Sequence, residues 1–140
     1  MSYFKLIKLN AIPSTNNFLK ERYQKGDCVD GELVWAKEQT KGRGQRERNW
    51  ISSAENSLTF SVYRSFTNFR SRNTFMVSAG VAIGIINALK VIGIPDLKIK
   101  WPNDILSCNK KVAGILIENI VKKSQLKSSI IGVGLNVNQL

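Results

Sequence analysis

A basic segment that carries two glycines is the part of this sequence best suited to chemistry. Arg43 lies between Gly42 and Gly44, and Arg46 and Arg48 follow shortly after. Glycine lets the backbone approach an anion closely, and arginine can neutralise that anion through paired hydrogen bonds. The segment therefore indicates a phosphate-binding loop. A solvated basic turn is the alternative, because short glycine-rich matches are frequent by chance.

A second motif, farther along the chain, favours the phosphate-binding interpretation. The motif Lys100-Trp101-Pro102-Asn103-Asp104 comes at the end of an apolar strand. Its proline must stop the strand, and an amide and a carboxylate follow the proline. Ligand sites of α/β proteins lie at the carboxyl ends of strands. We therefore expect the two motifs to contribute to one site.

The elements expected around these motifs are two helices and several strands. Ser14 or Thr15 can cap a first helix, which Gly26 ends, and apolar residues at helical spacing predict a core helix from Ser71 to a stop at Gly93. Alternation and turn residues predict strands at 32–39, 57–64, 97–101, 105–106, 112–121 and 129–137, the last broken by glycines at 132 and 134.

Runs of consecutive strands, with helices packed against one side, predict an α+β fold around a mixed, mainly antiparallel sheet. We expect a single domain over residues 1–140. Gly80 and Gly84 in the long helix are expected to allow close packing on the sheet, because no strand and turn precede them as a dinucleotide-binding motif would require.

Composition narrows the chemistry further. The 140 residues include no histidine, which excludes a histidine-dependent serine or cysteine triad and leaves any metal to carboxylates and substrate phosphates. Cys28 and Cys108 are isolated and are expected to be reduced thiols. We expect the sequence to contain no apolar segment close to the ~20 residues of a membrane span. Its first residues lack a signal-peptide pattern. These features predict a cytoplasmic protein with no membrane partner.

The net charge of +11 raises the question of a nucleic-acid partner. The basic cluster at 37–48 carries glycines and lacks the interleaved aromatic residues of a base-stacking surface. Lys122, Lys123 and Lys127 are expected at a solvated hairpin tip. We interpret the positive charge as serving mainly solubility at the surface and, in part, the binding of ATP and an acidic carrier protein. A basic nucleic-acid-binding module stays as the alternative.

Five segments, in order, resemble the motifs of the biotin protein ligases, which activate biotin as an adenylate and attach it to a carrier lysine. These segments are Ser14-Thr15-Asn16, 39–44, 100–104, 111–118 and 132–138. Together they extend over nearly the whole chain. The resemblance implies the catalytic domain of the biotin and lipoate ligases, which is similar to that of the class II aminoacyl-tRNA synthetases.

The resemblance also implies roles for residues of the site. Arg43 would bridge the biotin carboxylate and the α-phosphate, Lys111 would lie over both, and Asp104 would accept a proton from the carrier lysine or orient it. The implied biotin contacts are Ser14, Thr15, Asn16, Gln39, Gly42, Arg43, Gly44, Gln45, Lys111 and Gly114. The implied ATP or adenylate contacts are Arg46, Arg48, Trp50, Asn103 and Asn136.

Each of these roles has a structural alternative. Trp50 can be a core residue, and Asp104 can be a turn residue at a strand end. Lys111 can be an exposed lysine of a hairpin, although the neighbouring Lys110 is the better candidate for an exposed hairpin lysine. Adenylation itself needs no general base, because the attacking carboxylate is already ionised, and this suits a site without histidine. The implied cofactors are biotin as substrate, ATP, and Mg²⁺ carried on the ATP phosphates without a protein metal site.

The extent of the resemblance predicts a ligase of the monofunctional type. No helix-turn-helix pattern precedes Ser14, so we expect no DNA binding, and the chain stops at Leu140, where family members continue into a barrel-like C-terminal domain. We therefore expect a catalytic domain that is incomplete at its C-terminus. The implied partner is a biotin carboxyl carrier protein, such as the acetyl-CoA carboxylase subunit; a homodimer is left open.

Gln45 and Glu47 depart from the family pattern, which often has arginine and glycine there, and we expect weaker retention of the adenylate as a result. Three other functions remain as alternatives: a lipoate or acyl ligase of the same superfamily, the nucleic-acid-binding module, and an inactive remnant. The Gly-Arg-Gly loop and the Trp-Pro-Asn-Asp segment favour biotin over lipoate.

Overall fold

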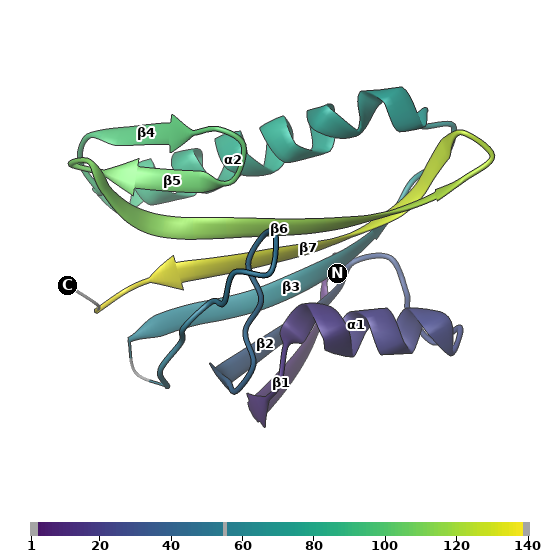
Figure 1. Ribbon diagram of the computed structural model, residues 1–140, viewed down its shortest axis with the longest axis horizontal. Coiled ribbons are helices and arrows are strands. Elements are labelled where there is room, and N and C mark those ends of the chain that lie inside the picture. The colour runs from purple at the N-terminus through teal and green to yellow at the C-terminus, as the bar shows by residue number, and fades with distance from the viewer. Residues whose placement is uncertain (1–2, 55, 139–140) are drawn as a thin grey trace.

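One mixed sheet of seven strands organises the computed structural model, which describes residues 3–54 and 56–138 (Figure 1). The strand order is β1-β2-β3-β7-β6-β5-β4; β1 and β2 pair in parallel and every other neighbouring pair is antiparallel. The predicted α+β fold with a mainly antiparallel sheet is therefore confirmed. The strands are β1 Lys5–Ile12, β2 Glu32–Gln39, β3 Ser57–Ser65, β4 Leu97–Lys100, β5 Asp104–Ser107, β6 Lys110–Lys122 and β7 Gln125–Asn136.

The first helix, α1, spans Thr15–Gln24 and begins where the sequence predicts. The Ser14 hydroxyl accepts a hydrogen bond from the backbone N–H of Asn17, at 3.2 Å, and so caps the first turn. Gly26 ends the helix with a φ of 78°, in the left-handed region that glycine enters without strain. Leu19 of α1 is fully buried against a cluster that includes Val34 and Ile130.

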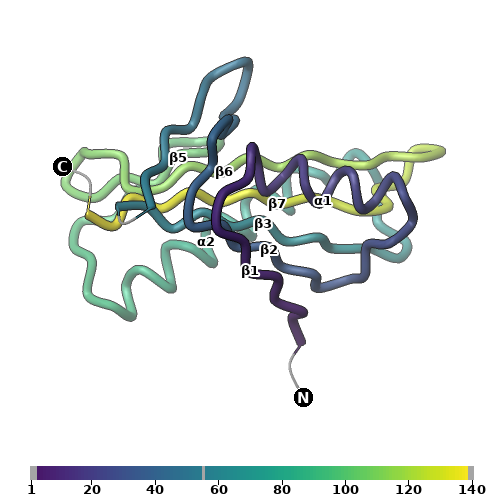
Figure 2. Tube along the Cα trace, turned by 90° about the horizontal axis from the view of Figure 1, so that it is seen from below, coloured from purple at the N-terminus to yellow at the C-terminus, as the bar shows by residue number. Residues whose placement is uncertain are grey.

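The second helix, α2, spans Thr74–Val91 after a short 3₁₀ turn, and it packs on the other face of the sheet from α1 (Figure 2). Ala82 and Leu89 of α2 contact a cluster with Ile105, Ala113 and Ile115. Because side chains of a strand alternate between faces, apolar residues on both sides of β6 and β7 require a helix on each side. The expectation that the helices cover one side was wrong.

The outer face of α2 is more exposed than a core helix would be. Phe75 is 60% exposed and Val91 is 87% exposed. Gly80 and Gly84 lie on this outer face, and a Cβ at either would meet nothing within 4 Å, so the expected role in close packing was wrong. Ser71–Val91 is also long and apolar enough to cross a membrane by length and composition alone, contrary to the expectation of no such run.

Strand β7 runs without a break through Gly132 and Gly134, where the sequence suggested an interruption. Both glycines keep their regular pairing, Gly132 with Ser61 and Gly134 with Thr59 of β3. Their missing side chains leave a shallow strip on the α1 face of the sheet rather than a gap in the strand. Strand β1, which has no turn signal before it, was not predicted.

A buried ion pair joins α1 to β2. The Arg22 guanidinium donates to Glu32 Oε1 at 2.6 Å, and Glu32 is fully buried. Burial opposes ionisation of Glu32, but the hydrogen bond and the positive charge of Arg22 outweigh it, so the pKa of Glu32 is lowered. The pair fixes α1 on the sheet at the end opposite the helix start.

Candidate active site

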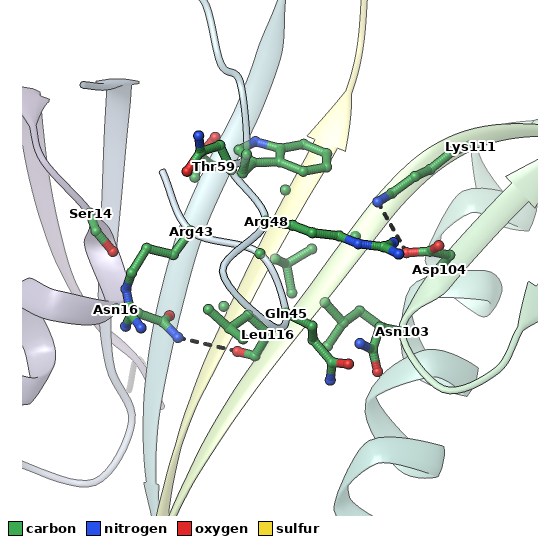
Figure 3. Close-up of a pocket in the computed structure, with 18 of the residues that line it drawn as sticks. Ser14, Asn16, Arg43, Gln45, Arg48, Thr59, Asn103, Asp104, Lys111 and Leu116 are labelled. Atoms are coloured by element: carbon green, nitrogen blue, oxygen red, sulfur yellow. Dashed lines mark hydrogen bonds and ion pairs between the residues drawn. The ribbon is translucent and has the colours of Figure 1, made fainter. Parts of the chain in front are cut away.

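A cavity of about 420 Å³ opens on the α1 face of the sheet, above the glycine strip (Figure 3). The start of α1, the loop between β2 and β3, and the turn between β4 and β5 enclose it. All the site residues predicted from the sequence line this cavity except Gly42 and Asn136. The two motifs that suggested phosphate chemistry therefore meet in one place.

Glycines form the floor of the cavity. Gly114 of β6 pairs with Gly134 of β7, and Gly132 lies next along the same face. A Cβ at Gly134 would overlap the indole of Trp50, and a Cβ at Gly132 would overlap the side chain of Asn16. Both side chains can rest on the sheet only because these positions lack a Cβ.

One end of the cavity is polar and uncharged. Gln39 Oε1 accepts hydrogen bonds from the Thr15 backbone N–H, at 2.7 Å, and from the Thr15 hydroxyl, at 3.0 Å. The Thr15 hydroxyl also contacts Ser61 Oγ at 2.7 Å, and Ser61 Oγ donates to Asn16 Oδ1. These side chains are buried and hold one another in fixed orientations, so this end presents pre-organised donors and acceptors to a neutral ligand.

The glycine-rich loop is a short hairpin that crosses the cavity. The Trp50 N–H donates to Gly42 O at 2.8 Å, and the Arg48 N–H donates to Gln45 O at 3.0 Å, which closes a tight turn. A Cβ at Gly42 would overlap the carbonyl of Trp50, so Gly42 serves the loop backbone rather than the cavity wall. The two central turn residues, Arg46 and Glu47, have φ values of 49° and 63°.

Arg43 extends from this hairpin toward the uncharged end, away from Lys111 (Figure 3). Its guanidinium is paired with the carboxylate of Glu118 on β6. Asn16 also donates to Glu118 Oε1, at 3.1 Å, and to the carbonyl of Leu116, at 3.2 Å. The sequence identified Arg43 as a ligand contact but gave no sign that a carboxylate of the protein itself holds it.

The other end of the cavity is cationic. Lys111 Nζ lies 3.1 Å from Asp104 Oδ1 and 5.4 Å from the centre of the Trp50 ring. A bulge puts Lys111 there: Lys111 pairs with Leu106 and Gly114 pairs with Asp104, so Lys111 and Gly114 share a face although they are three positions apart. Regular alternation from the sequence would not have predicted this.

The remaining predicted residues take different positions. Asn103, Arg46 and Arg48 line the cavity, whereas the Asn136 amide donates to the Lys111 carbonyl, at 3.2 Å, and supports the strand that carries the lysine. Sequence reasoning missed Thr59, Phe60 and Val133 in the wall and Ser61 and Glu118 behind it. Thr59 and Ser61 were visible as polar positions alternating in a strand that was otherwise apolar.

In the part of the chain that the structure describes, five basic side chains and one carboxylate line the cavity. Among the described residues, no three metal-ligating side chains come together. The arrangement can therefore bind an anion strongly at one end and a neutral polar group at the other, with an apolar floor between them.

The family model for the biotin/lipoate A/B protein ligase family matches residues 9–136. The bifunctional ligase/repressor BirA of Salmonella typhimurium is 33% identical over 92% of this chain, and the biotin–[acetyl-CoA-carboxylase] ligase of Mycobacterium tuberculosis is 33% identical over 90%. The chain spans 39% and 47% of the lengths of these two relatives.

A solved structure of the biotin protein ligase from Aquifex aeolicus, in complex with biotin and ATP, is similar over 96% of this chain and 53% of its own. The TM-score is 0.66 and the sequence identity is 34%. The sheet and helices described above therefore have the architecture of that ligase.

Proposed function

Because the chain belongs to the biotin/lipoate A/B protein ligase family, we propose that it carries the catalytic site of a biotin protein ligase. The observation that carries this proposal is the division of one cavity into an uncharged polar end, a glycine floor and a cationic end. Biotin has the same division: a neutral ureido ring, an apolar tail and a carboxylate. The volume lies within the range typical of small-molecule sites.

The uncharged end suits the ureido ring. Thr15, Asn16 and Gln39 are held in a closed hydrogen-bond network, so little side-chain entropy is lost when a ligand binds. The tail would lie along Gly114 and Gly134, which leaves the carboxylate beside the basic residues of the loop. The similar ligase of Aquifex aeolicus was solved in complex with both biotin and ATP, which supports a cavity that holds the two together.

In the first step, a carboxylate oxygen of biotin attacks the α-phosphorus of ATP, the bond from that phosphorus to the β-phosphate oxygen breaks, and pyrophosphate leaves. The site must hold two anions together and neutralise the phosphate oxygens. Lys111 would supply this charge from the cationic end, and Arg46 and Arg48 would supply it from the hairpin. Arg43, which points toward the other end, would contribute through the guanidinium donors that Glu118 leaves free. Trp50 offers an aromatic face beside Lys111 for the adenine.

In the second step, the amine of a carrier lysine attacks the carbonyl carbon of biotinyl-adenylate, an amide bond forms and AMP leaves. The amine must first lose a proton, and Asp104 offers the carboxylate at this end of the cavity. Its contact with Lys111 Nζ, at 3.1 Å, fixes that carboxylate in place. We propose a biotin carboxyl carrier protein as the partner and the cytoplasm as the location; both described cysteines are free thiols.

A Mg²⁺ ion would neutralise phosphate charge in the first step. Among the described lining residues, Asp104 is the one carboxylate, and it is already paired with a lysine, so these residues suit a metal that arrives on ATP and keeps water and phosphate ligands.

Exchange of labelled pyrophosphate into ATP tests the proposal. We expect exchange that requires biotin, and calorimetric titration should show biotin binding that tightens when ATP is present. Exchange with lipoate but not with biotin would show that the substrate is wrong, and binding of neither acid would show that the cavity is not an acyl-adenylate site.

A further inference from the structure

Glu118 is the centre of a contact network that the proposed reaction does not use. Its carboxylate pairs with the Arg43 guanidinium, accepts a hydrogen bond from Asn16 Nδ2 at 3.1 Å, and lies 3.6 Å from Lys20 Nζ. These three partners belong to the glycine-rich loop, the start of α1 and the middle of α1. One carboxylate therefore joins the loop to the helix across strand β6.

Glu118 is not among the described residues that line the cavity, and its side chain is only 23% exposed. It cannot act on a ligand directly from this position. Arg43 and Asn16 both line the cavity, so any influence of Glu118 on a ligand passes through these two side chains.

The geometry leaves Arg43 able to bind a second anion while Glu118 holds it. A guanidinium has five N–H donors, and the contact with Glu118 Oε1 uses one nitrogen, Nη2. The Arg43 side chain is 38% exposed toward the cavity and solvent. A carboxylate that fixes one edge of the guanidinium determines where its remaining donors point.

We propose that Glu118 is a positioning residue of the ligase site: it fixes Arg43, and through Arg43 the glycine-rich hairpin, against the residues of the uncharged end. The inference rests on the proposed function. A continuous path of contacts supports it, from Gln39 through Thr15, Ser61 and Asn16 to Glu118 and Arg43. Binding at the uncharged end and order in the loop are thereby linked.

Limited digestion with trypsin tests the link to the loop without any ligand, because Lys41, Arg43, Arg46 and Arg48 are cleavage sites in the hairpin. Glu118→Gln removes the charge that holds Arg43, and we expect loop cleavage to become roughly tenfold faster, the change expected from losing a charge-assisted hydrogen bond. Lys20→Met is the matched control: it removes the other cation near Glu118 and should leave the cleavage rate unchanged. Equal rates for Glu118→Gln and the native protein would overturn the proposal.

Pyrophosphate exchange tests the link to catalysis through a double-mutant cycle. Glu118→Gln should lower biotin-dependent exchange roughly tenfold in the native background and have little further effect when Arg43 is already alanine. Equal losses in both backgrounds, or tighter biotin binding by Glu118→Gln, would show that Glu118 does not act by positioning Arg43.

Glu118→Asp keeps the negative charge, but its shorter side chain moves the carboxylate away from Arg43. This variant should behave like Glu118→Gln, and it replaces Glu118→Gln in both tests if the glutamine variant does not fold. If the native protein shows no biotin-dependent exchange, the proposed function fails, and the trypsin comparison still decides whether Glu118 holds the loop.

Discussion

At the scale of single residues, Lys110 and Lys111 are neighbours that are both exposed but differ in their contacts. Lys111 lines the cavity and reaches Asp104 and the Trp50 ring, whereas Lys110 lies outside the cavity. We predict that Lys111→Ala lowers biotin-dependent pyrophosphate exchange by about tenfold or more, since one charge-assisted contact contributes about 1.5–3 kcal/mol. Lys110→Ala should leave the rate nearly unchanged. Similar effects of the two changes on turnover would remove Lys111 from the site.

The buried pair of Glu32 and Arg22 predicts how stability depends on pH. The pKa of Glu32 is lowered in the folded protein, so the pair stabilises the fold fully above the unfolded value of about 4.3 and progressively less as pH falls through and below it. Glu32→Gln should cost about 2 kcal/mol at pH 7, because Arg22 loses its charged partner. It should also remove part of the decline in stability below about pH 5.

Denaturant unfolding at several pH values between 7 and 3 measures this difference. The curves of unfolding free energy against pH for the native protein and for Glu32→Gln should converge as the pH falls. Parallel curves would mean that Glu32 does not bind protons differently in the folded and unfolded states.

The sequence identified individual chemical groups better than their partners. Gly42, Arg43 and Gly44 predicted a loop at a ligand site because their types are unusual together, and the structure places Arg43 and Gly44 in the cavity wall. Glu118, the partner of Arg43, lies 75 positions away in a strand that otherwise reads as apolar, and no local pattern joins the two. Long-range pairing of this kind depends on sheet register, which alternation alone does not determine.

At the scale of elements, the two exposed glycines of α2 weaken the helix without any gain in packing. Gly80→Ala and Gly84→Ala should each raise the unfolding free energy by about 0.5–1 kcal/mol, because alanine loses less backbone entropy and meets no atom within 4 Å. Gly134→Ala is the control with the opposite sign, since its Cβ would overlap the Trp50 indole. Thermal melting of the three variants checks the prediction, and destabilisation by Gly84→Ala would contradict the exposed position of that glycine.

The turn of the glycine-rich hairpin holds Glu47 in the left-handed region, which costs a residue with a side chain about 1 kcal/mol. Glu47→Gly removes both this strain and a negative charge, whereas Glu47→Gln removes the charge alone. If the protein forms biotinyl-adenylate as proposed, Glu47→Gly should slow its release several-fold, and Glu47→Gln should slow it less. Rapid-mixing measurements of adenylate dissociation compare them; equal rates for both variants would assign the effect to charge.

Elements were predictable where the pattern was local. Strand β2 was predicted with its exact bounds, and α1 began at its predicted cap, because alternation and capping are properties of adjacent residues. The bulge that turns Lys111 toward Asp104, and the two-sided placement of the helices, were not predictable, since both depend on neighbouring strands. The apolar periodicity of α2 was correctly identified, but it could not show that only Ala82 and Leu89 become buried.

At the scale of the whole molecule, β7 occupies the centre of the sheet although it is the last of the seven described strands in sequence. It pairs with β3 on one side and β6 on the other, and the glycine floor of the cavity lies along it. We predict that a chain stopped at residue 124 forms no cooperatively melting sheet, because β3 and β6 would each lack a neighbour. Hydrogen exchange checks this: protection of the β3 amides in the shortened chain equal to that in the native protein would contradict it.

The central position of β7 has a consequence for synthesis on the ribosome. While residues 125–136 are still within the exit tunnel, the emerged chain can form only two separate groups of strands, β1-β2-β3 and β4-β5-β6, each with an unpaired inner edge. Such edges pair readily with other chains. The interval between the emergence of β3 and that of β7 is therefore a period when a newly made molecule is exposed to aggregation, and the translation speed over β4 to β6 sets how long it lasts.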